Sequence, residues 1–306
     1  MLTIEEAIAR VPFLANTKEL NVNKLEGGIT NQNFRIDYGK QSCVIRITGA
    51  DTEILGIRRD IEYAANLDAG RLGIAPEVLY FIKPEGYLVT RFVDGNKIPP
   101  VNMTETKNIR RVVKKVSNYH NNAQKLNGEF NVFRRIEWFG SVSKRYNCKL
   151  PNDFAWFLQK INKVERSFLK EPYIPTPCHN DLLNLNFLDE FGDLKILDWE
   201  YAGMGDIFFD LANFSQHHMF TDEQDEIELH EYFGHVSPKH FARLKLMKPM
   251  SEIHEALWGT TQEEISKLDE DFQGYADYWF NRARSDLQDS RFDQWLLDVD
   301  GLQAGY

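Results

Sequence analysis

The sequence predicts a two-lobed α+β protein, with a small β-rich N-terminal lobe containing one helix at 1–93 and a larger, mainly helical C-terminal lobe at 94–306. Short apolar runs separated by turn residues fill the first lobe, a pattern typical of strands. After Asp94–Gly95 the apolar residues recur at helical spacing. A single predicted hairpin interrupts the helical lobe, and irregular insertions of this kind usually carry a functional site.

Composition limits the function classes. The 306 residues are 42% hydrophobic and 27% charged, which suits a globular protein able to bury a sizeable core. Lysine and arginine total 36 against 46 acids, so the formal net charge is −10. This balance disfavours nucleic acid and anionic membranes as partners, and it tolerates a cationic substrate.

Cysteine usage and hydropathy predict a location. The three cysteines lie too far apart in sequence to suggest a paired metal site, which fits a reducing compartment. The N-terminal residues lack the pattern of a signal peptide, and no apolar run approaches the length of a membrane span. We expect a soluble, cytoplasmic protein without membrane insertion, and the sequence leaves its oligomeric state open.

The elements of the first lobe follow from local patterns. Thr3 and Glu6 form a capping-box pattern that predicts a helix from Ile4, limited by Pro12. Between 21 and 47, apolar runs and turn residues predict three strands. A helix is expected at 53–71, because its isoleucines and alanines recur on one face, and two more strands are expected at E-V-L-Y-F-I and G-Y-L-V-T-R-F-V.

The second lobe is predicted to be helical apart from its insert. Helices are expected at 104–121, 153–170, 206–217, 222–233, 238–267 and 271–288. The insert H-N-D-L-L-N-L-N-F-L-D-E-F-G-D-L-K-I-L-D-W-E-Y-A-G holds two short strands, 186–188 and 194–197, joined by an E-F-G-D turn.

Polar residues of the insert occur at a spacing suited to phosphoryl transfer. His179, Asp181 and Asn186 form H-N-D-x-x-x-x-N, and Asp198 ends the next strand. Transfer to an alcohol needs a carboxylate at the hydroxyl, oxygen ligands for Mg²⁺ and cations on the phosphates. Each residue alone could simply close a turn, and the complete spacing favours the catalytic interpretation.

This stretch resembles the phosphotransferase motif shared by choline/ethanolamine kinases and aminoglycoside phosphotransferases, which are similar to protein kinases in fold. The resemblance implies that Asp181 is the catalytic base and that Asn186 and Asp198 bind the metal. I-L-D-W-E-Y-A-G followed by F-D-L-A-N is similar to the choline/ethanolamine kinase pattern I-D-F-E-Y with F-D-I-x-N downstream. It implies that Glu200 lies near the second metal or the substrate and that Asp210 braces the catalytic loop.

The glycine-containing stretch of the first lobe also resembles the family. L-E-G-G-I-T-N-Q-N-F is similar to L-x-G-G-x-T-N-x-x-F of bacterial choline kinases. By this resemblance Gly27, Gly28, Thr30 and Asn31 would line a loop over the phosphates of ATP. Two adjacent glycines are weak evidence for such a loop without the resemblance.

A charged residue within an apolar strand points to the same chemistry. Arg46 is the single charge of C-V-I-R-I, so it either faces solvent or pairs with a partner. The resemblance implies that Arg46 binds the phosphates and that Glu62, on the following helix, is its ion-pair partner, although Glu62 could also lie on a solvated helix face. Thr90 and Phe92 belong to T-R-F-V-D-G, where the hinge that contacts adenine is expected.

The acceptor site is expected in the last third of the chain. Aromatic faces and acids bind ammonium groups, and Glu200, Trp258 and Tyr275 are the candidate substrate residues. The family stretch W-G-L-W is matched by L-W-G-T-T-Q, with Trp258 at the first tryptophan and Thr261 at the second. Met204 also stands where the family often has tyrosine. Two fewer aromatic residues disfavour choline as the acceptor and leave ethanolamine or another amino alcohol open.

Other aromatic and histidine residues have simpler interpretations. Tyr275, Tyr278 and Trp279 have helical spacing and could be core residues instead of a cation cage. Six histidines lie close together in sequence without zinc-ligand spacing, so we expect solvated helix surface: His217, His218, His230, His235, His240 and His254. His120 and His179 are assigned structural roles.

The sequence therefore predicts an ATP- and Mg²⁺-dependent phosphotransferase acting on choline, ethanolamine or a related small amino alcohol. One alternative is a phosphotransferase for aminoglycosides or other small alcohols, because the H-N-D and Asp elements are shared. A second is an inactive nucleotide-binding regulator, which is disfavoured because Asp181, Asn186 and Asp198 are all present. The pathway stays open.

Overall fold

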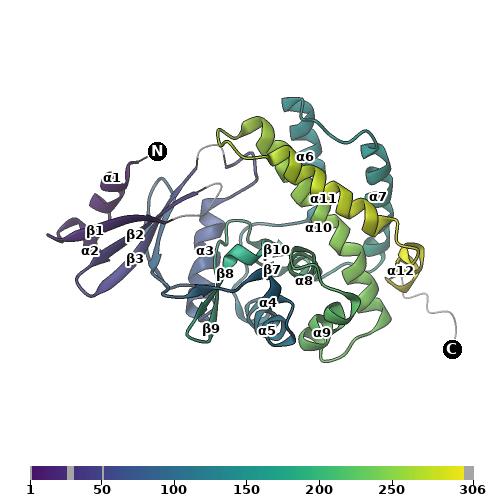
Figure 1. The fold of residues 1–306 in the computed structure, drawn as a ribbon, viewed down its shortest axis with the longest axis horizontal. Coiled ribbons are helices and arrows are strands. Elements are labelled where there is room, and N and C mark those ends of the chain that lie inside the picture. The colour runs from purple at the N-terminus through teal and green to yellow at the C-terminus, as the bar shows by residue number, and fades with distance from the viewer. Residues whose placement is uncertain (1, 26–30, 50–51, 300–306) are drawn as a thin grey trace.

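A five-stranded antiparallel sheet forms the N-terminal part of the molecule. The computed structural model describes residues 2–25, 31–49 and 52–299. The strands follow the spatial order β1-β2-β3-β5-β4 and lie at the left of Figure 1. Their bounds are β1 (Leu20–Leu25), β2 (Asn31–Tyr38), β3 (Gln41–Thr48), β4 (Val78–Ile82) and β5 (Tyr87–Arg91).

The two faces of this sheet have different partners. In β3 the side chains of Cys43, Ile45 and Ile47 are buried in a core with the first two helices, α1 (Ile4–Ala9) and α2 (Pro12–Ala15). Because side chains alternate along a strand, Val44 and Arg46 point to the opposite face. That face looks toward the helical part of the molecule.

The helix between β3 and β4 is shorter than predicted. The expected helix at 53–71 begins only at α3 (Arg59–Arg71), because residues 52–56 form turns. Gly56 has a φ of 72°, a left-handed conformation that an α-helix cannot continue through. Ile57 consequently packs into the large core of the helical part and not on a helix face.

The C-terminal part is mainly helical, as predicted. The 15-residue α6, the 8-residue α12 and the short α4 were not expected from the sequence. The helices are α4 (Pro100–Met103), α5 (Thr106–Asn122), α6 (Val132–Tyr146), α7 (Phe154–Lys170), α8 (Ile207–His217), α9 (Asp222–Phe233), α10 (Pro238–Ile265), α11 (Phe272–Leu287) and α12 (Phe292–Val299).

The predicted hairpin is present within the helical part. β8 (Phe187–Glu190) pairs with β9 (Asp193–Ile196), and β6 (Asn96–Lys97) joins the edge of β8. A short 3₁₀ turn, η1 (Asn184–Asn186), precedes β8. A second ribbon, β7 (Thr176–Cys178) with β10 (Gly203–Gly205), brackets this segment, and both lie in the centre of Figure 1.

Helix α10 is the central element of the helical part. It packs against α6, α8, α11 and α12, and a continuous run of its residues from Leu246 to Leu257 is buried. Because neighbours cover it on all sides, its apolar residues do not form one stripe. Among the described residues, no helix is both long enough and apolar enough to cross a membrane.

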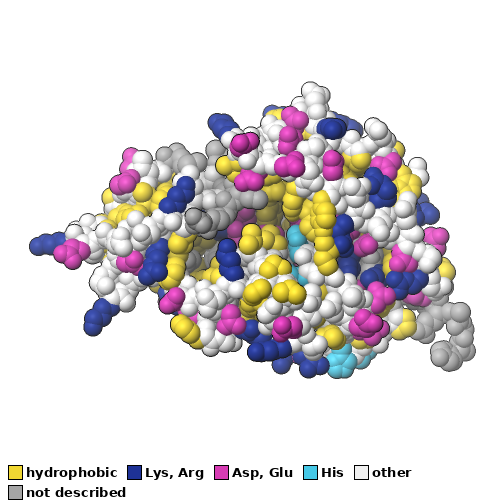
Figure 2. All heavy atoms as spheres, viewed as in Figure 1, with side chains coloured by type: hydrophobic (Ala, Val, Ile, Leu, Met, Phe, Trp, Pro, Cys, Tyr) yellow, Lys and Arg dark blue, Asp and Glu magenta, His cyan; other side chains and the backbone are white. Residues whose placement is uncertain are grey.

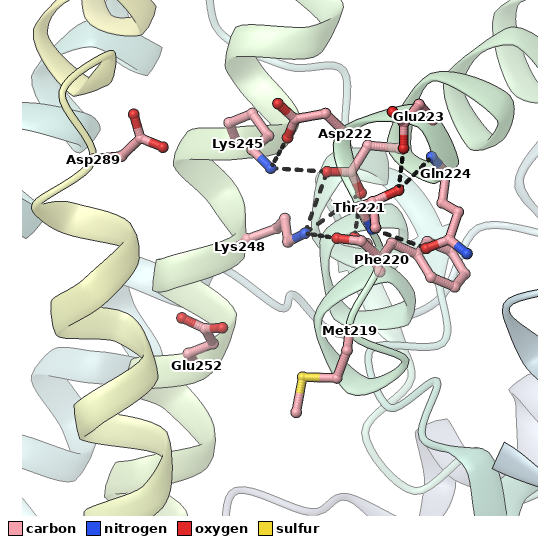
Figure 3. Close-up of polar contacts among 12 residues, drawn as sticks. Met219, Phe220, Thr221, Asp222, Glu223, Gln224, Lys245, Lys248, Glu252 and Asp289 are labelled. Atoms are coloured by element: carbon pink, nitrogen blue, oxygen red, sulfur yellow. Dashed lines mark hydrogen bonds and ion pairs between the residues drawn. The ribbon is translucent and has the colours of Figure 1, made fainter. Parts of the chain in front are cut away.

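A buried charge network ties α9 to α10. Lys248 donates to the carbonyl oxygen of Phe220 at 3.4 Å and to Asp225 at 3.3 Å. Lys245 donates to Asp222 at 2.8 Å and to Asp225 at 3.0 Å. Figure 3 shows both lysines reaching from α10 toward the start of α9. Pairing of this kind is what makes buried charges tolerable.

Candidate active site

A cavity of about 580 Å³ lies between the sheet and the helical part. Its lining comes from strands β1, β2, β3 and β5, helix α3, the connection after β5, the segment around η1 and β9, and helices α8, α10 and α11. Figure 2 shows hydrophobic side chains gathered at the middle of the molecule, with histidine among them. The residues predicted for the site that line the cavity are Arg46, Thr90, Phe92, Asp181, Asn186, Asp198, Glu200, Trp258 and Tyr275.

The loop that carries Asp181 is fixed by a buried aspartate of α8. The Asp210 carboxylate accepts the backbone N–H of His179 at 2.9 Å and that of Asn180 at 2.6 Å. It also lies 2.9 Å from Nε2 of His120. Burial opposes ionisation, but the hydrogen bond from His120 holds the pKa of Asp210 below its usual range. The expected brace is therefore present, and His120 is part of it.

Asp181 is oriented by its own loop. Its backbone N–H donates to Nδ1 of His179 at 3.1 Å, and the His179 Nε2 lies 2.8 Å from the carbonyl oxygen of Leu197. The Asn186 amide donates to the Asp181 side chain at 3.1 Å and to its carbonyl at 2.8 Å. Burial, reinforced by the nearby carboxylates of Glu255 and Asp198, raises the pKa of Asp181 well above its ordinary value. A raised pKa makes this carboxylate a better proton acceptor.

Asp198 follows β9 in an unusual backbone conformation. Its φ of 61° turns the side chain into the cavity, where it forms an ion pair with Arg46. Burial opposes the charge, but the guanidinium of Arg46 holds the pKa of Asp198 below its ordinary value. A non-glycine residue in this conformation is strained and often belongs to a functional site.

Arg46 links the sheet to the helix α3 and to Asp198. It donates to Glu62 at 2.6 Å, and Glu62 is almost completely buried. The predicted ion pair is thus present. Arg59 also donates to Glu62, at 2.6 Å, and lies 3.3 Å from Glu200. The sequence analysis missed Arg59, although its position three residues before Glu62 on one helix face was a usable signal.

Glu200 lies deep in the cavity beside these cations. It accepts a hydrogen bond from the amide of Asn31 at 3.0 Å, so Asn31 contacts an acid of the helical part from strand β2. Burial, and next the charge of Asp198, raise the pKa of Glu200 to about 7. Gly27, Gly28 and Thr30, predicted to form the phosphate loop, lie outside the described residues.

The oxygen-rich group at this end of the cavity fits a divalent cation. Asp198 and Glu200 offer carboxylate oxygens. The amide nitrogen of Asn186 donates to Asp181, so its amide oxygen is the atom that Asn186 could offer to a metal. Oxygen ligands of this type are those that Mg²⁺ prefers. Burial and next the charge of Asp198 raise the pKa of Glu200, and a bound cation would favour its charged form.

Aromatic side chains line the other end of the cavity. Trp258 of α10 and Tyr275 and Trp279 of α11 all line it, with their ring planes edge-to-face at 70° and 74°. The Trp258 indole donates to the Tyr201 hydroxyl at 2.9 Å. Tyr278, which was grouped with these residues in the sequence, is instead 43% exposed.

Two residues of this end were not among the predicted site residues. Glu255 lies one helical turn before Trp258, and its carboxylate accepts the Tyr275 hydroxyl at 2.7 Å. Nε2 of His217 lies 3.6 Å from Glu255. Both line the cavity together with Asp181. No local pattern marked Glu255, because the same stretch of α10 also contains the polar residues Lys248, Ser251 and Glu252.

The expected histidine surface is wrong for three of the six residues. His218 and His254 are buried, and the His217 side chain is only 9% exposed. His254 packs edge-to-face against Phe130, Phe139 and Phe209. The error arises because α8 and α10 pack in the interior of the helical part, so their polar residues face the cavity or the core.

The two positions at which family aromatic residues were expected, Thr261 and Met204, are both buried. The Thr261 hydroxyl donates to the carbonyl oxygen of Leu257 at 2.8 Å inside the core, and Thr261 does not line the cavity. Met204 is buried in β10, where its sulfur accepts the N–H of Leu126 at 3.2 Å.

Comparisons with known proteins show the family of this chain. Residues 22–241 match the family model described as choline/ethanolamine kinase. Protein LicA of Haemophilus influenzae is 26% identical over 260 residues, which cover 82% of this chain and 75% of LicA. Human ethanolamine kinase 2 is 26% identical over 302 residues, covering 87% of this chain and 75% of the relative.

A solved structure is similar over almost the whole chain. The crystal structure of a choline/ethanolamine kinase family protein from Mesorhizobium loti superposes with a TM-score of 0.83 at 29% sequence identity. The superposition covers 96% of this chain and 97% of that one.

Proposed function

Because the chain belongs to the choline/ethanolamine kinase family and is a phosphotransferase of the kinase type, we propose that it transfers the γ-phosphoryl group of ATP to the hydroxyl of a small amino alcohol. The observation that supports this most is the convergence of Asp181, Asn186, Asp198 and the Arg46–Glu62 pair on one cavity. These groups come from both parts of the molecule. Together they supply a carboxylate for the acceptor hydroxyl, oxygen ligands for a metal and a cation for the phosphates, which are the groups that phosphoryl transfer needs.

In this proposal Asp181 orients the acceptor hydroxyl and takes its proton as the oxygen attacks the γ-phosphorus. The new P–O bond forms while the bond to the β,γ-bridging oxygen breaks, and ADP leaves with that electron pair. The Asn186 amide holds the Asp181 carboxylate in place.

The cations and the remaining acids act on the nucleotide. Arg46, held by Glu62, would contact the phosphates, and Thr90 and Phe92 line the part of the cavity where adenine would bind. Asn186, Asp198 and Glu200 would hold Mg²⁺, which when bound neutralises the charge developing on the phosphates.

Substitution of the proposed base tests this function. Asp181→Ala should lower kcat on amino alcohols by roughly 10²- to 10⁴-fold, the usual contribution of a positioned base, while ATP still binds. Steady-state turnover and nucleotide titration measure the two effects. Asp277→Asn, an exposed acid on α11, is the matched control and should keep wild-type kcat. Near-wild-type turnover by Asp181→Ala would overturn the assignment.

A further inference from the structure

Three polar side chains meet at the helical end of the cavity. The ligand atoms of Asp181, His217 and Glu255 all lie within 4.8 Å of one another. They come from the catalytic loop, the last turn of α8 and the middle of α10. An acceptor bound here would contact the proposed base and a second carboxylate at the same time.

Glu255 is built to stay charged. It is buried, and its Oε2 accepts the Tyr275 hydroxyl. Its Oε1 faces two imidazoles, His217 at 3.6 Å and His254 at 3.9 Å. Burial favours the neutral acid, but the two histidines hold the pKa of Glu255 below its ordinary value. A negative oxygen therefore faces the cavity.

The Oε1 atom still has room for a strong donor. Both imidazole nitrogens are beyond hydrogen-bond distance from it. Within the part of the chain that the structure describes, Nε2 of His217 is buried without a hydrogen-bond partner. Buried polar atoms of this kind usually meet a partner, in the protein or in a ligand.

We propose that Glu255 and His217 form the subsite for the acceptor's ammonium group, and that this subsite selects an ammonium with N–H bonds over a trimethylammonium. The inference rests on the proposed function, because Asp181 places the reacting hydroxyl. An ammonium N–H donates to Oε1 of Glu255, and another donates to Nε2 of a neutral His217 whose own proton is on Nδ1. The 4.8 Å limit between these groups requires a short spacer between hydroxyl and nitrogen, such as two carbons.

A quaternary ammonium fits this subsite less well. It has no N–H, so it would cover the Glu255 carboxylate without giving the hydrogen bond that offsets its desolvation. Trimethylammonium groups are instead bound by the faces of aromatic rings. Here the polar groups of Trp258 and Tyr275 are tied to Tyr201 and Glu255, and neighbouring rings contact one another edge-to-face.

The test is kcat/KM for ethanolamine, N-methylethanolamine, N,N-dimethylethanolamine and choline. Wild type should prefer ethanolamine and lose kcat/KM stepwise as N–H bonds are replaced. Glu255→Gln should lower kcat/KM for ethanolamine by about 10- to 100-fold, the range for a hydrogen bond to a charged group. Choline should lose less, so the ratio between the two substrates falls. Glu264→Gln, exposed on the same helix, should leave the ratio unchanged.

A milder variant distinguishes the effect of the Glu255 carboxylate from that of its hydrogen-bond donor Tyr275. Tyr275→Phe removes only the hydroxyl that donates to Glu255, so the preference for ethanolamine should persist. Titration with ATP shows whether each variant keeps its fold. If Glu255→Gln fails to bind ATP, the wild-type series and Tyr275→Phe decide the question.

Each contrary result has a distinct meaning. An unchanged ratio in folded Glu255→Gln, or a wild-type preference for choline, would overturn the ammonium subsite and leave the proposed function standing. A wild-type protein that phosphorylates none of the four amino alcohols would overturn the proposed function, and this inference with it.

Discussion

At the scale of single residues, Arg46 has two acidic partners. It donates to Glu62 and forms an ion pair with Asp198. Glu62 is buried behind it, whereas the Asp198 side chain is 28% exposed toward the cavity. The Glu62 contact therefore positions the guanidinium, and Asp198 is the partner that a bound cation can share.

Removing the charge of Asp198 should greatly lower Mg²⁺-dependent turnover. Asp198→Asn keeps the size of the side chain but loses the negative charge that the proposed Mg²⁺ site needs. We expect kcat at saturating Mg²⁺ to fall by at least about 10²-fold, the scale of losing one group that stabilises developing charge. Magnesium titrations of the initial rate measure this.

The control for this variant is Asp193→Asn. Asp193 begins β9 on the same hairpin, is half exposed and pairs with Lys115 and Lys195 away from the cavity. It should titrate with Mg²⁺ like wild type. Full activity of Asp198→Asn with an unchanged Mg²⁺ requirement would rule out Asp198 as a ligand.

At the scale of elements, helices fix the loop that carries Asp181 through buried polar contacts. Asp210 of α8 accepts two backbone N–H groups of the loop, and His120 of α5 supports Asp210. Asn213, one turn later on α8, accepts the N–H of Leu182 at 2.5 Å. The loop that follows β7 is thus held from one side by α8, which explains how irregular backbone can hold Asp181 in a defined place.

The stability of the packing between α10 and α11 depends on the protonation of one buried acid, Glu252. Glu252 of α10 is buried, accepts a hydrogen bond from Arg282 at 3.1 Å and lies in the region shown in Figure 3. Burial, and next the charge of Asp286, raise the pKa of Glu252 to about 8, against the opposing effects of Arg282 and Lys248. The folded state therefore keeps a proton that the unfolded chain loses near pH 4.5.

This raised pKa predicts how stability changes with pH. Its contribution is fully present below pH 4.5 and is lost as pH rises toward 8. Each unit of a pKa shift corresponds to about 1.4 kcal/mol, so wild type should lose a few kcal/mol relative to Glu252→Gln across this range. Urea unfolding of both proteins at the two ends of the range measures the difference in free energy.

Exposed Glu264→Gln on the same helix is the control for a general charge effect, and its difference from wild type should stay constant with pH. If the difference between wild type and Glu252→Gln also stays constant, Glu252 has an ordinary pKa in the folded protein.

At the scale of the whole molecule, the cavity exists because the sheet and the helical part face each other (Figure 1). Local patterns were sufficient to predict the five strands of the N-terminal sheet and the hairpin of the insert, but not the short strands β6, β7 and β10. The capping box at Thr3 is observed as predicted. The alternation in β3 exposes Arg46 to the cavity, and motif spacing brings Asp181, Asn186 and Asp198 together.

Other features depend on long-range packing and could not be predicted. Glu255 and His217 approach each other only because α8 packs on α10, and no local pattern reports that contact. Their helices are buried on several faces, so burial of a histidine cannot be read from periodicity. The late start of α3 depends on the conformation of Gly56, for which the apolar spacing at 53–71 gives no signal.

The central claim is that the γ-phosphoryl group of ATP moves to the hydroxyl of a small amino alcohol. The most direct measurement follows ATP labelled at the γ-phosphorus, with Mg²⁺ and one acceptor at a time: ethanolamine, its N-methylated forms, choline or an aminoglycoside. We predict that the label appears on an amino alcohol, first of all ethanolamine. Label transferred to the aminoglycoside and to none of the amino alcohols, or to no acceptor at all, would contradict the account.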